Sequence, residues 1–75
     1  MRWQDHIVSD PGTLHGTPRF KGTRIPVSLV LENLAAGTPS EELHIQWPTL
    51  PQEAIPAALA YAADLARDRI VPISA

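Results

Sequence analysis

The sequence predicts a small, mainly α domain in which three helices follow a short N-terminal β-hairpin. After Val27 the apolar residues recur at helical spacing between helix-ending residues, whereas the chain before it is rich in glycine and proline. A chain of 75 residues without cysteine suffices for one domain with a thin core and no disulfide framework. The predicted parts are a polar segment at 1–6 that is a candidate disordered tail, a strand and hairpin at 7–27, helices at 28–69 and a tail at 70–75.

The N-terminal part is predicted to be a strand followed by a tight hairpin. Ile7 and Val8 favour a strand, which the Asp-Pro-Gly turn signal after them ends. The hairpin is centred on Gly22, between the short stretches 19–21 and 23–25. Trp3, in front of the strand, keeps three possible roles: an anchor in the core, an anchor at an interface, or part of a disordered tail.

Two helices are predicted to follow the hairpin. Ser28 and Gly37 are typical residues for the two ends of a first helix, and Ser40 is a typical N-cap for a second helix that ends before Pro48. The residues expected to face the core are Val27, Leu31, Leu34 and Ala35 in the first helix and Leu43 with, in part, residues 45–47 in the second.

The start of the third helix admits two predictions. Thr49 and Gln52 have the spacing of a capping box, but Pro56 would then lie inside the helix, where it removes a hydrogen bond. We therefore favour an irregular turn over residues 51–54 and a regular helix over residues 55–69, with Pro56 in its first turn.

The third helix has apolar residues on two faces. A helix of this kind in a small domain is expected to contact a second chain, which also suits a homodimer as the route to a larger buried surface. The first face carries Ile55, Leu59, Ala62, Ala63 and Ala66. The predicted partner or dimer interface consists of Ala58, Tyr61 and Leu65 on the second face with Ile70 and Ile73 in the tail.

The charge pattern argues against general attraction to nucleic acid but leaves a local basic patch. The formal net charge is -2, so phosphate binding would have to come from the hairpin, where Arg19, Lys21 and Arg24 lie close together. The alternative is that Arg24 pairs with a nearby carboxylate and the other two are solvated. Because residues 23–27 connect the hairpin to the first helix, Arg19 and Lys21 are the better candidates for contact with a partner.

The sequence gives little support to catalysis. His6, His15 and His44 lie in separate elements without metal-binding spacing, and neither a cysteine nucleophile nor a Gly-x-Ser-x-Gly motif is present. We therefore expect no enzyme activity, cofactor, metal or small-molecule substrate. No stretch approaches the length of a membrane span and no apolar leader is present, so a cytoplasmic protein is expected.

Residues 40–69 are compatible with a helix-turn-helix, in which the second helix enters the major groove of DNA. The start of that helix offers Gln52, Glu53 and alanines, a poor set for reading bases. We therefore favour packing over direct base contact for this helix.

Several motifs together resemble the domain-of-unknown-function 433 family of bacteria and archaea. The resemblance covers residues 7–63, and its most distinctive part is Gly-Thr-Arg-Ile-Pro-Val at residues 22–27. The other matching motifs are Ile-Val-Ser-Asp-Pro at 7–11, Gly-x-Pro at 16–18, Leu-Ala-Ala-Gly at 34–37, Glu-Glu-Leu at 41–43, Pro-x-Leu at 48–50 and Ile-x-Ala-Ala-Leu-x-Tyr-Ala-Ala at 55–63.

The resemblance implies a dimeric, homeodomain-like or winged-helix domain that acts as an antitoxin of a type II toxin-antitoxin pair. Such proteins bind a PIN-like nuclease toxin encoded beside them and repress their own operon, so operator DNA is a second implied partner. The alternatives are a DNA-binding regulator without a toxin partner and an interaction module that does not bind DNA. Arg19, Pro51 and Pro56 depart from the family pattern, the first by adding charge to the hairpin and the others at the start of the third helix.

Overall fold

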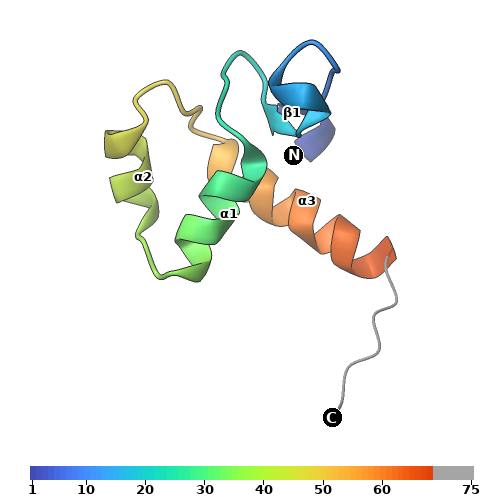
Figure 1. Cartoon of the computed structure of the whole chain (residues 1–75). Helices are drawn as coiled ribbons and strands as arrows, with labels where there is room; N and C mark the ends of the chain where they lie inside the picture. Colours follow the sequence, from blue (N-terminus) through green and yellow to red (C-terminus); the bar gives the residue numbers. More distant parts are fainter. Residues whose placement is uncertain (69–75) are drawn as a thin grey trace.

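Three helices and a two-stranded antiparallel sheet form the part of the chain that the computed structural model describes, residues 1–68 (Figure 1). The mainly α fold with a short N-terminal sheet is therefore confirmed. The helix α1 packs against both α2 and α3. The elements in chain order are the 3₁₀ turn η1 (Trp3–Asp5), β1 (Ile7–Val8), the turn η2 (Leu14–Gly16), β2 (Arg19–Phe20), α1 (Val27–Ala35), α2 (Ser40–Gln46) and α3 (Ala54–Asp68).

The sheet pairs the first strand with the first arm of the predicted hairpin. Ile7 lies opposite Phe20 in the antiparallel register. The chain reverses at Gly22 as predicted, because the Phe20 N–H donates to the carbonyl oxygen of Ile25 at 3.1 Å. Residues 23–25 do not form the second strand that we expected. The Thr23 hydroxyl oxygen accepts the Ile25 N–H at 3.0 Å, so this side chain replaces a hydrogen bond between strands.

The helix α1 begins two residues earlier than its predicted N-cap implies and ends as predicted. Its N-cap is Pro26, whose extended backbone leads directly into the helix, whereas Ser28 lies exposed in the first turn and caps nothing. At the other end Gly37 has φ 89° and donates to the Leu34 carbonyl at 3.0 Å. Thr38 donates to the Asn33 carbonyl at 3.0 Å, which completes a Schellman motif.

The helix α2 is short and buries one residue. Its N-cap is Pro39 rather than Ser40, and it ends before Pro48 as predicted. Leu43 is fully buried, whereas Ile45 is 76% exposed, so the prediction that Ile45 is partly buried is wrong. A residue two positions along a helix points to nearly the opposite face, and the face that carries Leu43 is the one toward the core.

The helix α3 starts where the preferred prediction placed it, after an irregular turn. The Ala54 N–H donates to the Pro51 carbonyl at 3.0 Å, and the Ala57 N–H donates to the Glu53 carbonyl at 2.9 Å. Pro56 therefore lies in the first turn, where its missing N–H leaves no hydrogen bond unmade.

The core lies where β2 and the three helices meet. Its small members on α3 allow that helix to approach α1 closely. The prediction for α1 holds for Val27, which is buried, and for Leu31 and Leu34, which are half-buried and pack against the core. It is wrong for the exposed Ala35, and it missed the fully buried Val30. The buried residues are Ile7, Phe20, Ile25, Val27, Val30, Leu43, Leu50, Ala54, Ala57 and Ala58.

The N-terminal segment is folded against α3, which corrects the expectation of a disordered tail at residues 1–6. The Trp3 ring meets the Tyr61 ring edge to face, with centroids 5.0 Å apart and planes at 79°. Its indole N–H donates to the Asp64 carboxylate, which also pairs with Arg67. Of the three roles left open for Trp3, the structure shows the intramolecular anchor.

The loop between β1 and β2 holds a left-handed turn. Leu14 and His15 have φ values of 52° and 54°, and Gly16 follows with φ 82°. A side chain in this region costs about 1–2 kcal/mol per residue, because its Cβ crowds the next carbonyl oxygen. His15 is exposed, so this cost is not offset by burial.

We predict that His15→Gly raises the free energy of unfolding by about 0.5–1 kcal/mol, since glycine adopts this conformation without strain. Urea unfolding followed by circular dichroism measures the change. The matched control is Thr17→Gly, at an extended position with φ -64°, where glycine should lower stability. A loss of stability in His15→Gly would contradict the prediction.

Candidate protein-binding site

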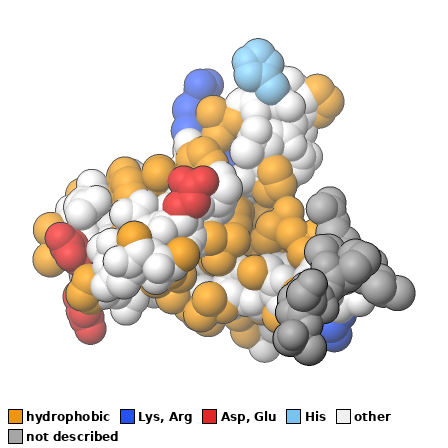
Figure 2. Space-filling model, turned by 60° about the horizontal axis from the view of Figure 1, so that its bottom comes forward, with side chains coloured by type: hydrophobic (Ala, Val, Ile, Leu, Met, Phe, Trp, Pro, Cys, Tyr) orange, Lys and Arg blue, Asp and Glu red, His pale blue; other side chains and the backbone are white. Residues whose placement is uncertain are grey.

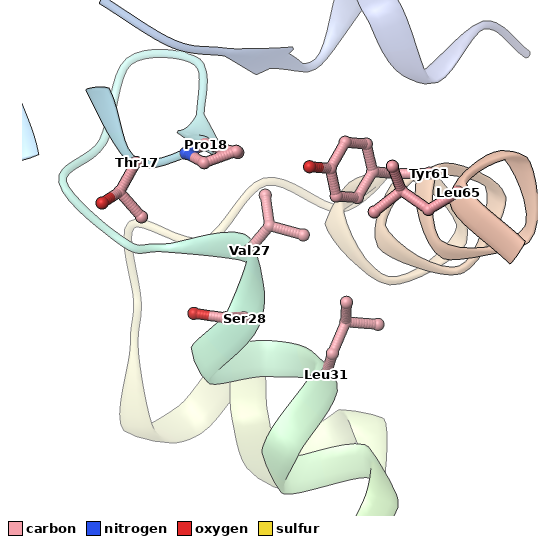
Figure 3. Close-up of a pocket in the computed structure, with 7 residues that line it drawn as sticks. All are labelled: Thr17, Pro18, Val27, Ser28, Leu31, Tyr61 and Leu65. Carbon is pink, nitrogen blue, oxygen red and sulfur yellow. The ribbon is translucent and has the colours of Figure 1, made fainter. Parts of the chain in front are cut away.

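An apolar pocket opens between the loop before β2, the first turns of α1 and the second half of α3 (Figure 3). Its volume is about 230 Å³ and most of its wall is carbon. For comparison, an engineered apolar cavity of about 150 Å³ binds benzene. The pocket is therefore large enough for one or two aliphatic or aromatic side chains. It is lined by Thr17, Pro18, Val27, Ser28, Leu31, Tyr61 and Leu65.

Local backbone structure brings these side chains together. The Val27 N–H donates to the Pro18 carbonyl at 3.0 Å, which holds the loop against the start of α1. Leu31 is one turn further along α1, on the same side of the helix as Val27. Tyr61 and Leu65 are likewise one turn apart on α3. The pocket thus has one wall from each helix and a third from the loop.

The Tyr61 ring lines the pocket and also packs edge to face against Trp3. The indole hydrogen bond to Asp64 holds Trp3 in this position beside α3. Figure 3 shows the Tyr61 hydroxyl pointing across the pocket toward the side of Pro18 and Val27. No sequence signal linked Trp3 to this site, because Asp64 is 61 residues away along the chain.

The pocket combines an apolar wall with a few hydroxyl groups. The polar groups among its lining side chains are the hydroxyls of Thr17, Ser28 and Tyr61. Hydroxyls beside an apolar wall can hydrogen-bond to the backbone of an inserted segment whose side chain fills the space. Figure 2 shows hydrophobic side chains gathered across one face of the molecule, a surface suited to contact with another apolar surface.

The structure corrects the predicted interface in one position. Ala58 is fully buried in the core of this chain, because the side of α3 that it occupies packs inward, so it is not available to a partner. Tyr61 and Leu65 both line the pocket, and Leu65 is 39% exposed. Ile70 and Ile73 lie outside the described residues.

The other predicted face of α3 is largely solvent-exposed. Leu59 is 52% exposed, and Ala63 and Ala66 are exposed as well. At the start of the helix Gln52 and Glu53 are exposed. The connection from α2 to α3 runs over residues 47–53, longer than the turn of about three or four residues in a helix-turn-helix.

The predicted cation patch is smaller than the sequence indicated. The Arg19 guanidinium pairs with the Asp10 carboxylate at 3.0 Å and donates to the Thr23 carbonyl at 3.0 Å. Only 16% of its side chain is exposed, so the proposal that Arg19 contacts phosphate is wrong. Lys21 and Arg24 are both exposed, on either side of Gly22. The alternative that Arg24 pairs with a nearby carboxylate is not seen within residues 1–68, where the ion pairs join Arg19 to Asp10 and Arg67 to Asp64.

The contact with Arg19 lowers the pKa of the Asp10 carboxyl. The hydrogen bond from Arg19 is the main cause that lowers the pKa of the Asp10 carboxyl below its ordinary value of 3.8, and the Arg19 charge and the Gly12 N–H act in the same direction. Partial burial opposes them. The unfolded chain therefore binds a proton at higher pH than the folded one, so this interaction stabilises the fold above about pH 4 and is lost as the pH falls through the folded pKa.

Two further features of residues 1–68 bear on function. These residues contain no group of three or more His, Asp or Glu side chains placed to hold a metal ion. Within the same range no helix is long and apolar enough to cross a membrane.

We predict that Asp10→Asn lowers stability at neutral pH and that its difference from the natural chain narrows as the pH falls below about 4. In the natural chain the Asp10 carboxylate accepts a hydrogen bond from the Gly12 N–H at 3.0 Å. The amide of Asn can still accept this bond, but it lacks the negative charge that pairs with Arg19. Thermal unfolding between pH 3 and pH 7 measures this. Asp5→Asn, at an exposed position, is the matched control. A pH-independent difference for Asp10→Asn would contradict the prediction.

The comparisons with known proteins agree with the resemblance in the sequence. "Uncharacterized protein y4eO" from Sinorhizobium fredii (strain NBRC 101917 / NGR234) is 43% identical over 56 residues, which is 75% of this chain and 25% of that protein. The chain thus matches about a quarter of the relative's length. No solved structure matches the chain. The family described as "Protein of unknown function (DUF433)" matches residues 7–62, from β1 into α3, and the chain therefore belongs to the DUF433 family.

Proposed function

We propose that this chain is a non-catalytic, antitoxin-type protein whose pocket binds a PIN-like nuclease toxin in the cytoplasm. The observation that carries the proposal is the apolar pocket between the loop, α1 and α3. A concave apolar site with a few hydroxyls suits an anchoring side chain of a partner protein, the type of contact that supplies most of the affinity in protein interfaces. The toxin as the partner follows from the resemblance to the family.

The distribution of charge favours a protein partner over DNA as the main ligand. With Arg19 held by Asp10, the exposed cations of the hairpin are Lys21 and Arg24. Two cations supply at most about two phosphate contacts, too few for tight binding by one chain. The start of α3 presents Gln52 and Glu53, of which the carboxylate would repel a phosphate backbone.

We predict that Leu65→Lys weakens binding to the PIN-like protein encoded beside this chain by about tenfold or more. The substitution places a charge at the pocket wall, where an apolar partner group would have to be buried against it. Isothermal titration calorimetry with the purified nuclease measures the affinity.

The matched control is Leu59→Lys, since Leu59 lies on the same helix, is 52% exposed and does not line the pocket. Its affinity should stay within about twofold of the natural chain. Equal losses in both variants, with circular dichroism showing both folded, would remove the pocket from the proposal. The absence of any PIN-like reading frame beside the gene would argue against a toxin partner.

A second candidate function is a DNA-binding regulator, with or without the toxin partner. It is favoured by the exposure of Lys21 and Arg24 on both sides of the Gly22 turn. A homodimer would present this pair twice and so double the number of phosphate contacts. The third possibility, an interaction module that does not bind DNA, is the result if no such binding is found.

For the second candidate function, we predict binding to the DNA upstream of the chain's own gene with an affinity that falls with salt. Lys21→Ala combined with Arg24→Ala should reduce the slope of log K against log salt by about two per subunit. Fluorescence anisotropy over a salt series measures it, and Arg2→Ala is the control for an exposed cation elsewhere. No binding at low salt would remove the operator role, and an unchanged slope would remove the two cations from it.

A further inference from the structure

We propose that the partner segment which enters the pocket carries a lysine or arginine beside its apolar anchor, and that Glu32 of α1 pairs with this cation. The inference rests on the function proposed above, because it takes a partner protein to be the occupant of the pocket. It adds the chemical class of the segment that binds and the residue of this chain that selects it.

The first argument is the position of Glu32 beside the pocket. Ser28 and Leu31 line the pocket from α1, and Ser28 is exposed, so it marks the solvent edge. Figure 3 shows Leu31 turned toward Tyr61 and Ser28 on the side of α1 away from α3. Residues four apart share one side of a helix, so Glu32 lies one turn, about 6 Å, beyond Ser28 along this edge. Its side chain is exposed, within reach of a group next to a bound anchor.

The second argument is the charge of the helices that form the pocket. None of the lining residues is charged, but residues 25–66 contain five acidic residues and no Lys or Arg. Within residues 1–68 the ion pairs use Asp10 and Asp64, so neither of them balances Glu32. Figure 2 shows acidic side chains among the hydrophobic ones on one face, with Lys and Arg toward its margins. Such a surface attracts a cation and repels an anion.

The third argument is that Glu32 does not help to stabilise α1. It lies in the last turn of the helix, where the outward-pointing backbone carbonyls disfavour a carboxylate. That turn contains no basic residue which would offset the effect. A cation from a partner would remove the unfavourable charge, so binding gives this residue a role that the fold does not.

A second copy of the helices is a poorer match than a different protein. The large apolar residues that the described helices expose are Ile45, Leu59 and Leu65. None of the three has a Lys or Arg directly beside it in the sequence. A partner in which Leu, Ile or Phe stands next to Lys or Arg supplies both the anchor and the cation.

The test uses three small probes that share a phenyl group and differ in charge at the other end: 3-phenylpropylamine, 3-phenylpropanoate and 3-phenylpropan-1-ol. Methyl NMR of the full chain follows Leu31 and Leu65 during each titration, with the exposed Ile45 as reference. Ligands of this size should bind in about the millimolar range. We expect the amine to bind about three- to tenfold more tightly than the carboxylate, with the alcohol between them, and the difference to shrink as salt is added.

Variants of Glu32 show whether this residue causes the preference. Glu32→Gln should bring the three affinities together, and Glu32→Lys should reverse their order. The lysine suits the last turn of α1, so this variant should remain folded, which circular dichroism checks. Glu42→Gln, at an exposed position of α2 that does not line the pocket, is the matched control and should leave the order unchanged.

Equal affinities of the natural chain for the three probes would overturn the role of Glu32 while leaving the apolar pocket as a binding site. Unchanged Leu31 and Leu65 signals with every probe would overturn the inference together with the pocket. Shifts that grow with protein concentration without any probe, together with a dimer by light scattering, would overturn it in favour of a second copy. Because no nuclease is present, these results are separate from the calorimetry on Leu65→Lys, which tests the toxin as partner.

Discussion

The burial of Phe20 is the constraint on which the rest of the structure depends. Its side chain is fully buried, while its backbone pairs with Ile7 in the sheet and with Ile25 across the turn. Its carbonyl oxygen also accepts the N–H and the hydroxyl of Thr23. One residue thus joins the N-terminal sheet to the helical core. In a chain this small, burying a single aromatic ring can contribute several kcal/mol, a large share of the net stability.

The helices and their ends were largely predictable because proline and glycine act locally. Pro48, Pro56 and Gly37 mark boundaries whatever the rest of the chain does, and each has the expected place in the structure. The choice of buried face was less predictable. A helix with apolar residues on two sides gives no local signal of which side meets the core, and Ala58 was therefore assigned to the wrong environment.

The candidate site was only partly predictable, because its geometry depends on contacts between distant residues. Tyr61 and Leu65 were identified from helical spacing, but the facing wall of Pro18, Val27 and Leu31 requires the loop to fold onto α1. The environment of Arg19 likewise depends on a contact with a distant residue. Its cationic group looked available beside Lys21, whereas the structure pairs it with a carboxylate nine positions earlier. A count of charges therefore overstates the basic surface by one residue in three.

The contact between Trp3 and α3 has a topological meaning beyond the pocket. Trp3 and Asp64 lie near opposite ends of the described chain and are joined by a hydrogen bond. Both also lie outside residues 7–62, the part that matches the DUF433 family. The polypeptide consequently enters and leaves the domain at neighbouring points. A unit with this property can be spliced into a surface loop of a larger protein, or circularly permuted through a short linker, without pulling its own sheet and helices apart.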